Sequence, residues 1–310
     1  MTTTAPAAPR RLPAETRLPP TQRRSRRVRR AKVTAGTALL ILAAAYVVAP
    51  LYWLLIAATK NSSQLFSTQT FLPPRHLSLG ANLRSLFTFS SGDFKFWIIN
   101  SAVYATVTAT LATGVSTLCG YALAKYRFGL RRPVFGVVVG SLMVPATALV
   151  VPIFMLENYL HLNNTYQGVI LPLALFPFGA YFMTIYSMDA VPDTLIDAAR
   201  IDGAGELTIF WRVARPVLMP GMATMFLLSF IATWNNYFLP LVLLGDPGRF
   251  PLTVGLGAWA SDLHQAGTGQ PLYPEVIVGS LIAVLPLLIL FPFLQKYVAR
   301  GLTFGAIAGE

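Results

Sequence analysis

Charge is scarce in this sequence of 310 residues. Charged side chains make up 12% of it, hydrophobic side chains make up 55%, and the mean hydropathy is +0.58. A soluble globular domain carries roughly 25% charged residues. The shortage of charge, together with long apolar runs, indicates an integral membrane protein rather than a soluble one.

Cysteine and histidine are also few. The single cysteine, Cys119, excludes an intramolecular disulfide framework and a zinc site built on cysteines. The three histidines, His76, His161 and His264, lie far apart in the sequence and are expected in exposed loops. No GxxxxGK[ST] and no HExxH is present, so we expect no catalytic centre, no metal, no cofactor and no phosphate-binding loop on this chain.

The apolar runs predict an all-α, polytopic membrane protein with six transmembrane helices, because a span needs about 20 apolar residues. The six candidate spans are 33–59, 96–124, 134–156, 168–188, 217–244 and 276–298.

Basic residues predict the orientation. Ten of the 24 lie in residues 1–32, nine more lie in segments on the same side of the predicted spans, and five lie on the other side. This bias places both termini in the cytoplasm. A basic arm can also bind nucleic acid. Here it precedes an apolar span, which favours a cytoplasmic anchor without nucleic acid, and its Pro, Ala and Thr content predicts disorder over 1–32.

The predicted spans hold almost no charge in their interiors. Lys125, Glu157 and Asp189 all fall at span ends. An ion-driven secondary transporter generally needs coordinating groups or broken helices near the membrane midplane, and a membrane enzyme needs clustered His, Asp or Glu. Both remain alternatives that the sequence does not favour, and an external energy source is expected.

The segment 191–220 is the exception to this shortage of charge. Between the fourth and fifth spans, on the cytoplasmic side, it holds four of the twelve acidic residues. Pro192 and the following aspartates predict a helix start, and Gly203 predicts its end. Ala199 and Gly203 are expected on one helix face, and Pro216 is expected to break or kink a second helix. Two short helices at a bend can be a docking site or a linker.

The segment resembles the EAA motif of the permease subunits of bacterial ABC importers, E-A-A-x-x-D-G-A-x(5)-F-x-x-I-x-L-P-x(3)-P. The spacing is intact, and three positions depart: Asp197 for Glu, Val213 for Ile and Arg215 for Leu. The resemblance implies a coupling helix that docks on a cytoplasmic ATPase. The residues it assigns to coupling are Asp197, Ala198, Ala199, Asp202, Gly203, Ala204, Phe210 and Pro216.

Other stretches resemble the carbohydrate-uptake branch of that family, in particular its maltose-type second permease. They are 58–60, 72–74, 81–82, 234–244, 251–256 and 301–309. The resemblance implies a heterodimer with a second permease, two copies of an ATPase that holds ATP and Mg²⁺, an extracytoplasmic sugar-binding protein and the lipid of the bacterial inner membrane. A polyamine or peptide remains an alternative solute.

The same resemblance divides the chain into an arm (1–32), a first helix and external loop (33–95), a transmembrane domain (96–298) with the coupling segment 191–220, and a cytoplasmic tail (299–310). Aromatic faces and amides recognise sugars, so Trp234, Asn235, Asn236 and Tyr237 are candidates for the substrate path. Packing at a helix end, with the amides bonded to neighbouring helices, is the alternative role for these four residues.

Overall fold

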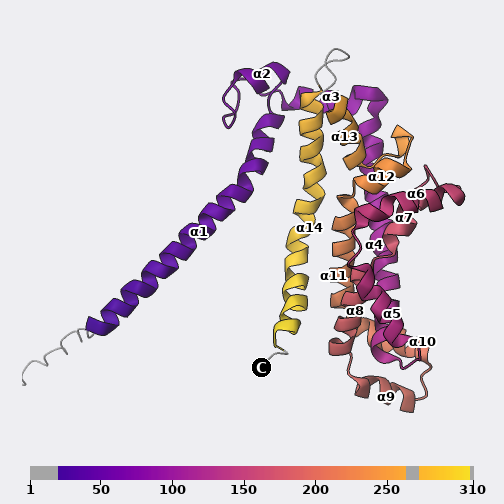
Figure 1. Cartoon of the computed structure of the whole chain (residues 1–310). Helices are drawn as coiled ribbons and strands as arrows, with labels where there is room; N and C mark the ends of the chain where they lie inside the picture. The colour runs from indigo at the N-terminus through magenta and orange to yellow at the C-terminus, as the bar shows by residue number, and fades with distance from the viewer. Residues whose placement is uncertain (1–19, 263–271, 308–310) are drawn as a thin grey trace, which may run out of the picture. The chain divides into compact units, whose positions relative to one another are not determined.

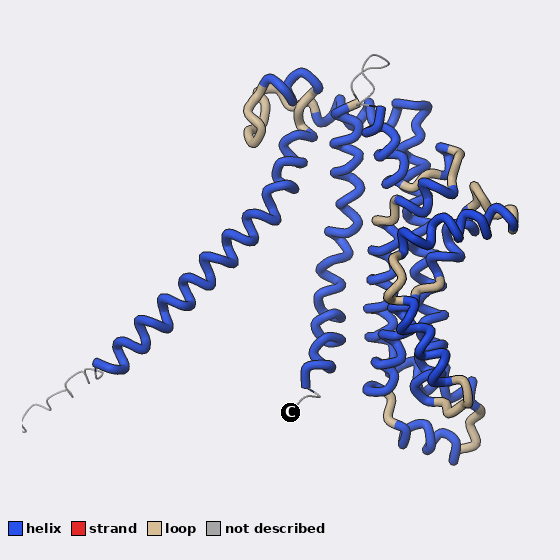
Figure 2. The backbone as a smooth tube through the Cα atoms, viewed as in Figure 1, coloured by secondary structure: helices blue, strands red, loops and turns tan. Residues whose placement is uncertain are grey.

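The computed structural model describes residues 20–262 and 272–307, and within those ranges the chain is helical with no strand (Figure 2). Two compact units are distinguished, Met1–Leu54 and Leu55–Glu310. His264 lies outside the described residues.

The helices, labelled in Figure 1, follow one another in this order: α1 (Pro20–Ala58), α2 (Ser62–Ser67), α3 (Leu79–Thr88), η1 (Phe89–Gly92), α4 (Asp93–Lys125), α5 (Arg131–Ser141), η2 (Ala146–Leu149), α6 (Val150–Tyr159), α7 (Tyr166–Ala174), α8 (Pro177–Ala190), α9 (Asp193–Ile201), α10 (Glu206–Thr208), the π-helical turn η3 (Ile209–Ala214), α11 (Arg215–Trp234), α12 (Phe238–Leu243), η4 (Pro247–Arg249), α13 (Leu252–Asp262) and α14 (Tyr273–Ile307).

The predicted all-α membrane fold is confirmed. In the described ranges, five helical segments are long and apolar enough to cross a membrane, and a sixth is reached if α5 and η2–α6 count as one span. Two predicted limits were too narrow. α1 begins at Pro20, so residues 20–32 are helical rather than disordered, and α14 runs to Ile307, past the predicted end of its span.

The third predicted span, 134–156, is wrong as a single helix. Its two halves meet at an angle of 100°. The N–H groups that directly follow α5 bond three residues back, as in Met143 to Gly140, and Pro145 has no N–H to continue the ladder. Hydropathy averages over such a break, which is why the sequence alone reads as one span.

The fifth predicted span, 217–244, also has to be corrected. α11 ends at Trp234, where the Asn235 side chain donates to the Ile231 carbonyl, and α12 begins when Leu239 N donates to Asn236 Oδ1. The fourth span is interrupted between α7 and α8, where Pro177 restricts the preceding residue to extended backbone.

Small residues hold the centre of the second unit together. α4 packs against α8 and α11 (Figure 1) through a face that carries Ala109, Ala112, Ser116 and Gly120, all buried. A Cβ on Gly120 would lie 2.6 Å from the backbone of α8. Such close backbone approach is typical of membrane helix pairs, which gain little from apolar burial.

At the opposite end of this unit from α9, a buried polar residue ends α1. Asn82 of α3 donates from Nδ2 to the carbonyls of Ala58 and Lys60, both at 2.9 Å. The buried Lys60 ammonium donates to the Gln69 carbonyl at 2.6 Å. The Ala58–Lys60 and Ala81–Asn82 stretches noted in the sequence are therefore one structural unit.

Two glycines of α4 should respond in opposite directions to the same substitution. Gly120→Ala forces a Cβ into the α8 backbone and is expected to cost about 1–3 kcal/mol. Gly114→Ala meets nothing within 4 Å and should gain about 0.5–1 kcal/mol of helix stability. Thermal unfolding of the purified protein in detergent, followed by size-exclusion fluorescence, checks both. A Gly120→Ala protein as stable as Gly114→Ala would contradict the packing described for α4 and α8.

Candidate functional site

The helix α9 is bounded by local sequence. Pro192 caps its start, Asp193 lies in the first turn and Arg200 in the last, so both charges complement the helix dipole. Its end is a Schellman motif: Ala204 N donates to the Ala199 carbonyl, and Gly203 N donates to the Arg200 carbonyl. Gly203 has φ +80°, a conformation that favours glycine.

One expectation for this segment is corrected by the backbone. Gly203 lies beyond the end of α9, so it does not share a helix face with Ala199. Of the break or kink expected at Pro216, the break is absent. The chain runs as one helix from Glu206 to Trp234 and accommodates the missing N–H by a π-helical turn, η3, just before α11.

One apolar side of this segment is anchored in the bundle. Ile196, the buried residue of α9, packs with Ile209 and Phe210 in a cluster that includes Tyr121 of α4 and Met183 of α8. Phe210 contacts the Tyr121 ring at 5.2 Å between centroids. The segment is therefore packed against α4 and α8.

Ion pairs and hydrogen bonds also hold the segment to the end of α4. Lys125 at the end of α4 bonds Asp193 at 2.8 Å, and that ammonium lowers the pKa of the Asp193 carboxyl. The contribution of this pair is present at neutral pH and is lost only when the pH falls through the lowered pKa. Glu206 accepts from Tyr126 at 2.8 Å and from Arg200 at 2.9 Å. Burial, and next the bond to Glu206, raise the pKa of the Tyr126 phenol.

The outer side of the segment is exposed and partly apolar. Ile201 is 86% exposed, Leu207 78% and Trp211 54%. Singly exposed apolar residues are ordinary, but three within the eleven residues 201–211 offer apolar surface that a partner can cover. These three residues could not be singled out from the motif, because they fall at positions that it leaves unspecified.

The predicted coupling residues divide into two sets. Asp197, Ala198, Asp202, Gly203 and Pro216 are exposed, whereas Phe210 is buried and Ala199 and Ala204 pack against the cluster. The departure at Arg215 is accommodated on the surface, where its guanidinium lies over the Trp211 ring at 5.2 Å.

A cavity of about 450 Å³ lies where the broken spans meet. Its lining includes residues from all three interruptions, between α5 and η2, between α7 and α8, and after α11. The polar lining residues are Ser141, Thr147, Ser229, Thr233 and Asn236, and the aromatic ones are Phe176, Phe178 and Phe238. No charged side chain is among the residues that line it.

Of the four substrate-path candidates, Asn236 alone lines this cavity. Trp234 is buried and donates to the Ala283 carbonyl at 3.0 Å, and Asn235 bonds within its own helix. Tyr237 packs against Gly257. Packing is thus the visible role of the other three, while Ser229 and Thr233 of α11, which the sequence did not single out, line the cavity together with Asn236.

Comparison with known proteins yields a family and close relatives. A family model described as "Binding-protein-dependent transport system inner membrane component" matches residues 116–304. The chain is 37% identical to the arabinooligosaccharides transport system permease protein AraQ of Bacillus subtilis (strain 168), over 84% of this chain and 90% of that protein. It is 32% identical to the lactose transport system permease protein LacG of Rhizobium radiobacter, over 85% and 92%.

A solved structure shares the fold. A chain of a bacterial ABC transporter involved in the import of the acidic polysaccharide alginate matches with a TM-score of 0.76 and 24% identity. The match covers 87% of this chain and 98% of the other.

The Glu206 carboxylate should decide how firmly α9 is held. Glu206→Gln weakens its bonds to Tyr126 and Arg200, and we expect amide exchange over 193–205 to quicken about three- to tenfold, since bonds to charged groups exceed neutral ones. Asp202→Asn removes the same charge from an exposed residue with no such bonds and should leave exchange unchanged. Hydrogen–deuterium exchange with mass spectrometry measures both, and equal effects would contradict the role given to Glu206.

Proposed function

The chain belongs to the family of binding-protein-dependent transport system inner membrane components, the multi-pass permease subunits of ABC importers, and we propose that the solute it conducts is a sugar or oligosaccharide. The observation that carries this proposal is the uncharged cavity at the junction of the broken spans. Aromatic faces and hydroxyl or amide groups suit a neutral sugar. The names of the two relatives, which specify arabinooligosaccharides and lactose, support the same substrate class.

A cationic solute fits this cavity less well. A polyamine would need carboxylates in the lining, and none lines it. Broken spans also occur in ion-driven transporters, but coordinating carboxylates mark ion pathways and none lines this cavity. A peptide is the remaining alternative, and uptake measurements distinguish it.

The ATPase of the importer is proposed to dock on the outer side of 191–220. Asp197, Ala198, Asp202 and Gly203 would contact it together with the exposed patch of Ile201, Leu207 and Trp211. The buried Phe210, with Ala199 and Ala204, would hold the segment to the bundle, and Pro216 would belong to the turn that joins it to α11. ATP and Mg²⁺ would be bound by that partner.

One continuous helix connects the docked segment to the cavity. The helix from Glu206 to Trp234 contains 29 residues, about 43 Å at 1.5 Å per residue. Phe210 at one end belongs to the cluster that anchors α9, and Thr233 at the other lines the cavity. A push on α9 when the ATPase closes would tilt this helix and change access to the cavity.

The proposed assembly contains this chain, a second permease, two ATPase subunits and an extracytoplasmic sugar-binding protein. Both termini are proposed to be cytoplasmic, on the basis of the distribution of basic residues. The proposed division is an arm (1–32), a first helix and external loop (33–95), a transmembrane domain (96–298) and a tail (299–310).

Uptake tests the substrate class. The assembled importer in proteoliposomes should take up labelled arabinooligosaccharide or lactose, but not putrescine or a tripeptide, when ATP is inside. Thr233→Val keeps the side-chain shape and removes a hydroxyl from the cavity, so we expect a two- to tenfold rise in the half-saturating sugar concentration, about the value of one hydrogen bond. Thr224→Val, on the same helix but outside the lining, should change it little. Uptake of putrescine or tripeptide in place of sugar would overturn the proposal.

Two neighbouring glycines test the coupling segment. Gly203→Val places a β-branched residue at φ +80°, which costs roughly 1–2 kcal/mol and should displace the end of α9. Gly205→Val adds the same side chain at φ −72° with nothing within 4 Å. We expect Gly203→Val to abolish sugar-stimulated ATP hydrolysis and uptake at an unchanged membrane level, and Gly205→Val to retain most of both. Normal uptake in Gly203→Val would count against coupling through α9.

A further inference from the structure

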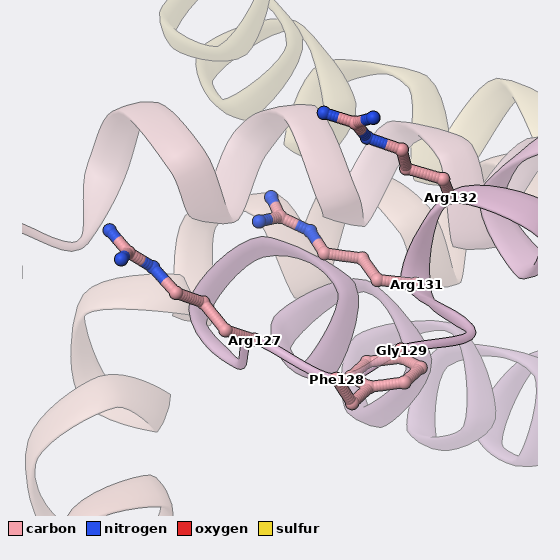
Figure 3. Close-up of a pocket in the computed structure, with 5 residues that line it drawn as sticks. All are labelled: Arg127, Phe128, Gly129, Arg131 and Arg132. Carbon is pink, nitrogen blue, oxygen red and sulfur yellow. The ribbon is translucent and has the colours of Figure 1, made fainter.

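The loop between α4 and α5 forms a hollow of about 420 Å³. It is lined by Arg127, Phe128, Gly129, Arg131 and Arg132. Figure 3 shows the three arginine side chains extending toward the same side of the view, with the Phe128 ring on the other side of the loop. At about 30 Å³ per water molecule, the hollow has room for roughly a dozen waters or for a small polar group.

The positive charge in this hollow is not neutralised. Among the described residues, no acidic side chain forms an ion pair with Arg127, Arg131 or Arg132. Asp193 is close enough for Arg127 to act on it electrostatically, but its carboxylate is bonded to Lys125 at 2.8 Å. Guanidinium groups stay protonated at any physiological pH. The hollow therefore offers an anion three guanidinium groups that no carboxylate of the described residues pairs with.

Apolar side chains alternate with these arginines. Phe128 is 43% exposed and Leu130 68% exposed, and on the adjoining α5 Val137 is 71% exposed. A free inorganic anion gives such side chains nothing to contact. A ligand with a charged head and a hydrocarbon part satisfies both kinds of residue.

The position of the loop matches the membrane interface. It follows Lys125, the end of a membrane-length apolar helix, and leads into α5, and Arg131 reaches back to the Ala124 carbonyl at 3.5 Å. Basic pockets at this depth bind lipid headgroups. We infer that the arginine hollow of the α4–α5 loop binds the headgroup of an anionic phospholipid, with Phe128 and Leu130 against its acyl chains.

Arginine suits this ligand because its planar fork bonds two phosphate oxygens at once. Each basic residue near an anionic membrane surface contributes about a fivefold gain in partition. Tyr126, next to Arg127, donates to Glu206 of the coupling segment. A lipid in the hollow would thus adjoin the segment that docks the ATPase, whichever solute the importer carries.

The test uses the purified importer, stripped of lipid in detergent, with bound lipid counted by native mass spectrometry. Phosphatidylglycerol should bind the wild type, and phosphatidylcholine should bind at least tenfold more weakly. Arg127→Gln with Arg132→Gln should weaken phosphatidylglycerol binding tenfold or more, with Arg131 left in place at the start of α5. The double variant Arg127→Lys with Arg132→Lys keeps the charge but not the planar guanidinium. Its affinity for phosphatidylglycerol should lie between those of the wild type and the double glutamine variant.

The matched control is Arg212→Gln, an exposed arginine of η3 that does not line the hollow, and it should bind phosphatidylglycerol as the wild type does. Unchanged binding in the double glutamine variant would overturn the inference. So would displacement of the lipid by millimolar inorganic phosphate, which would indicate a soluble-anion site. If the double glutamine variant lost the ATPase subunit from the complex but still bound phosphatidylglycerol, the hollow would be a protein contact instead. Sugar uptake plays no part in these readouts, so they stand apart from the substrate proposal.

Discussion

The structure depends on one constraint, that every backbone N–H and C=O inside the hydrocarbon layer must find a partner within the protein. Continuous helices such as α4 meet it by themselves. A broken span frees several backbone groups and is tolerated only where protein or an internal cavity surrounds it. In this chain the three broken spans all contribute to the lining of the same cavity of about 450 Å³. The cost of interrupting helices in a membrane is thus concentrated at one place, where a polar solute also needs polar groups.

The ends of the helix Glu206–Trp234 belong to two different environments. At one end, Phe210 and Ile209 pack with Ile196 of α9, among rings from α4. At the other, Ser229 and Thr233 face the cavity. The intervening helix is continuous from Glu206 to Trp234, although Pro216 and Pro220 remove two N–H donors from it, and it packs on α4 and α8. In the proposed function, the contact with the ATPase and the contact with the solute therefore lie at the two ends of one helix.

Much of this could be predicted from the sequence, and the exceptions have physical causes. Hydropathy located the apolar segments, and motif spacing located 191–220, because both depend on local composition. Hydropathy did not reveal the breaks at Pro145 and Asn235, since a window of about 20 residues averages over one turn. The motif did not reveal the exposed Ile201 and Leu207, because both stand at positions that it leaves unspecified. Which polar residues meet in the cavity depends on tertiary packing that no local pattern encodes.

The π-helical turn at Ile209–Ala214 has a geometric consequence of its own. One extra residue in a helical turn rotates everything before it by about 100° relative to everything after it, because an α-helix advances 100° per residue. The turn therefore sets the angle between the side of α10 that carries Leu207 and the side of α11 that carries Thr233. The direction from which a partner can approach Leu207, measured around the helix axis from Thr233, thus depends on this one turn. A regular α-helix with the same side chains would place Leu207 about 100° away around the axis.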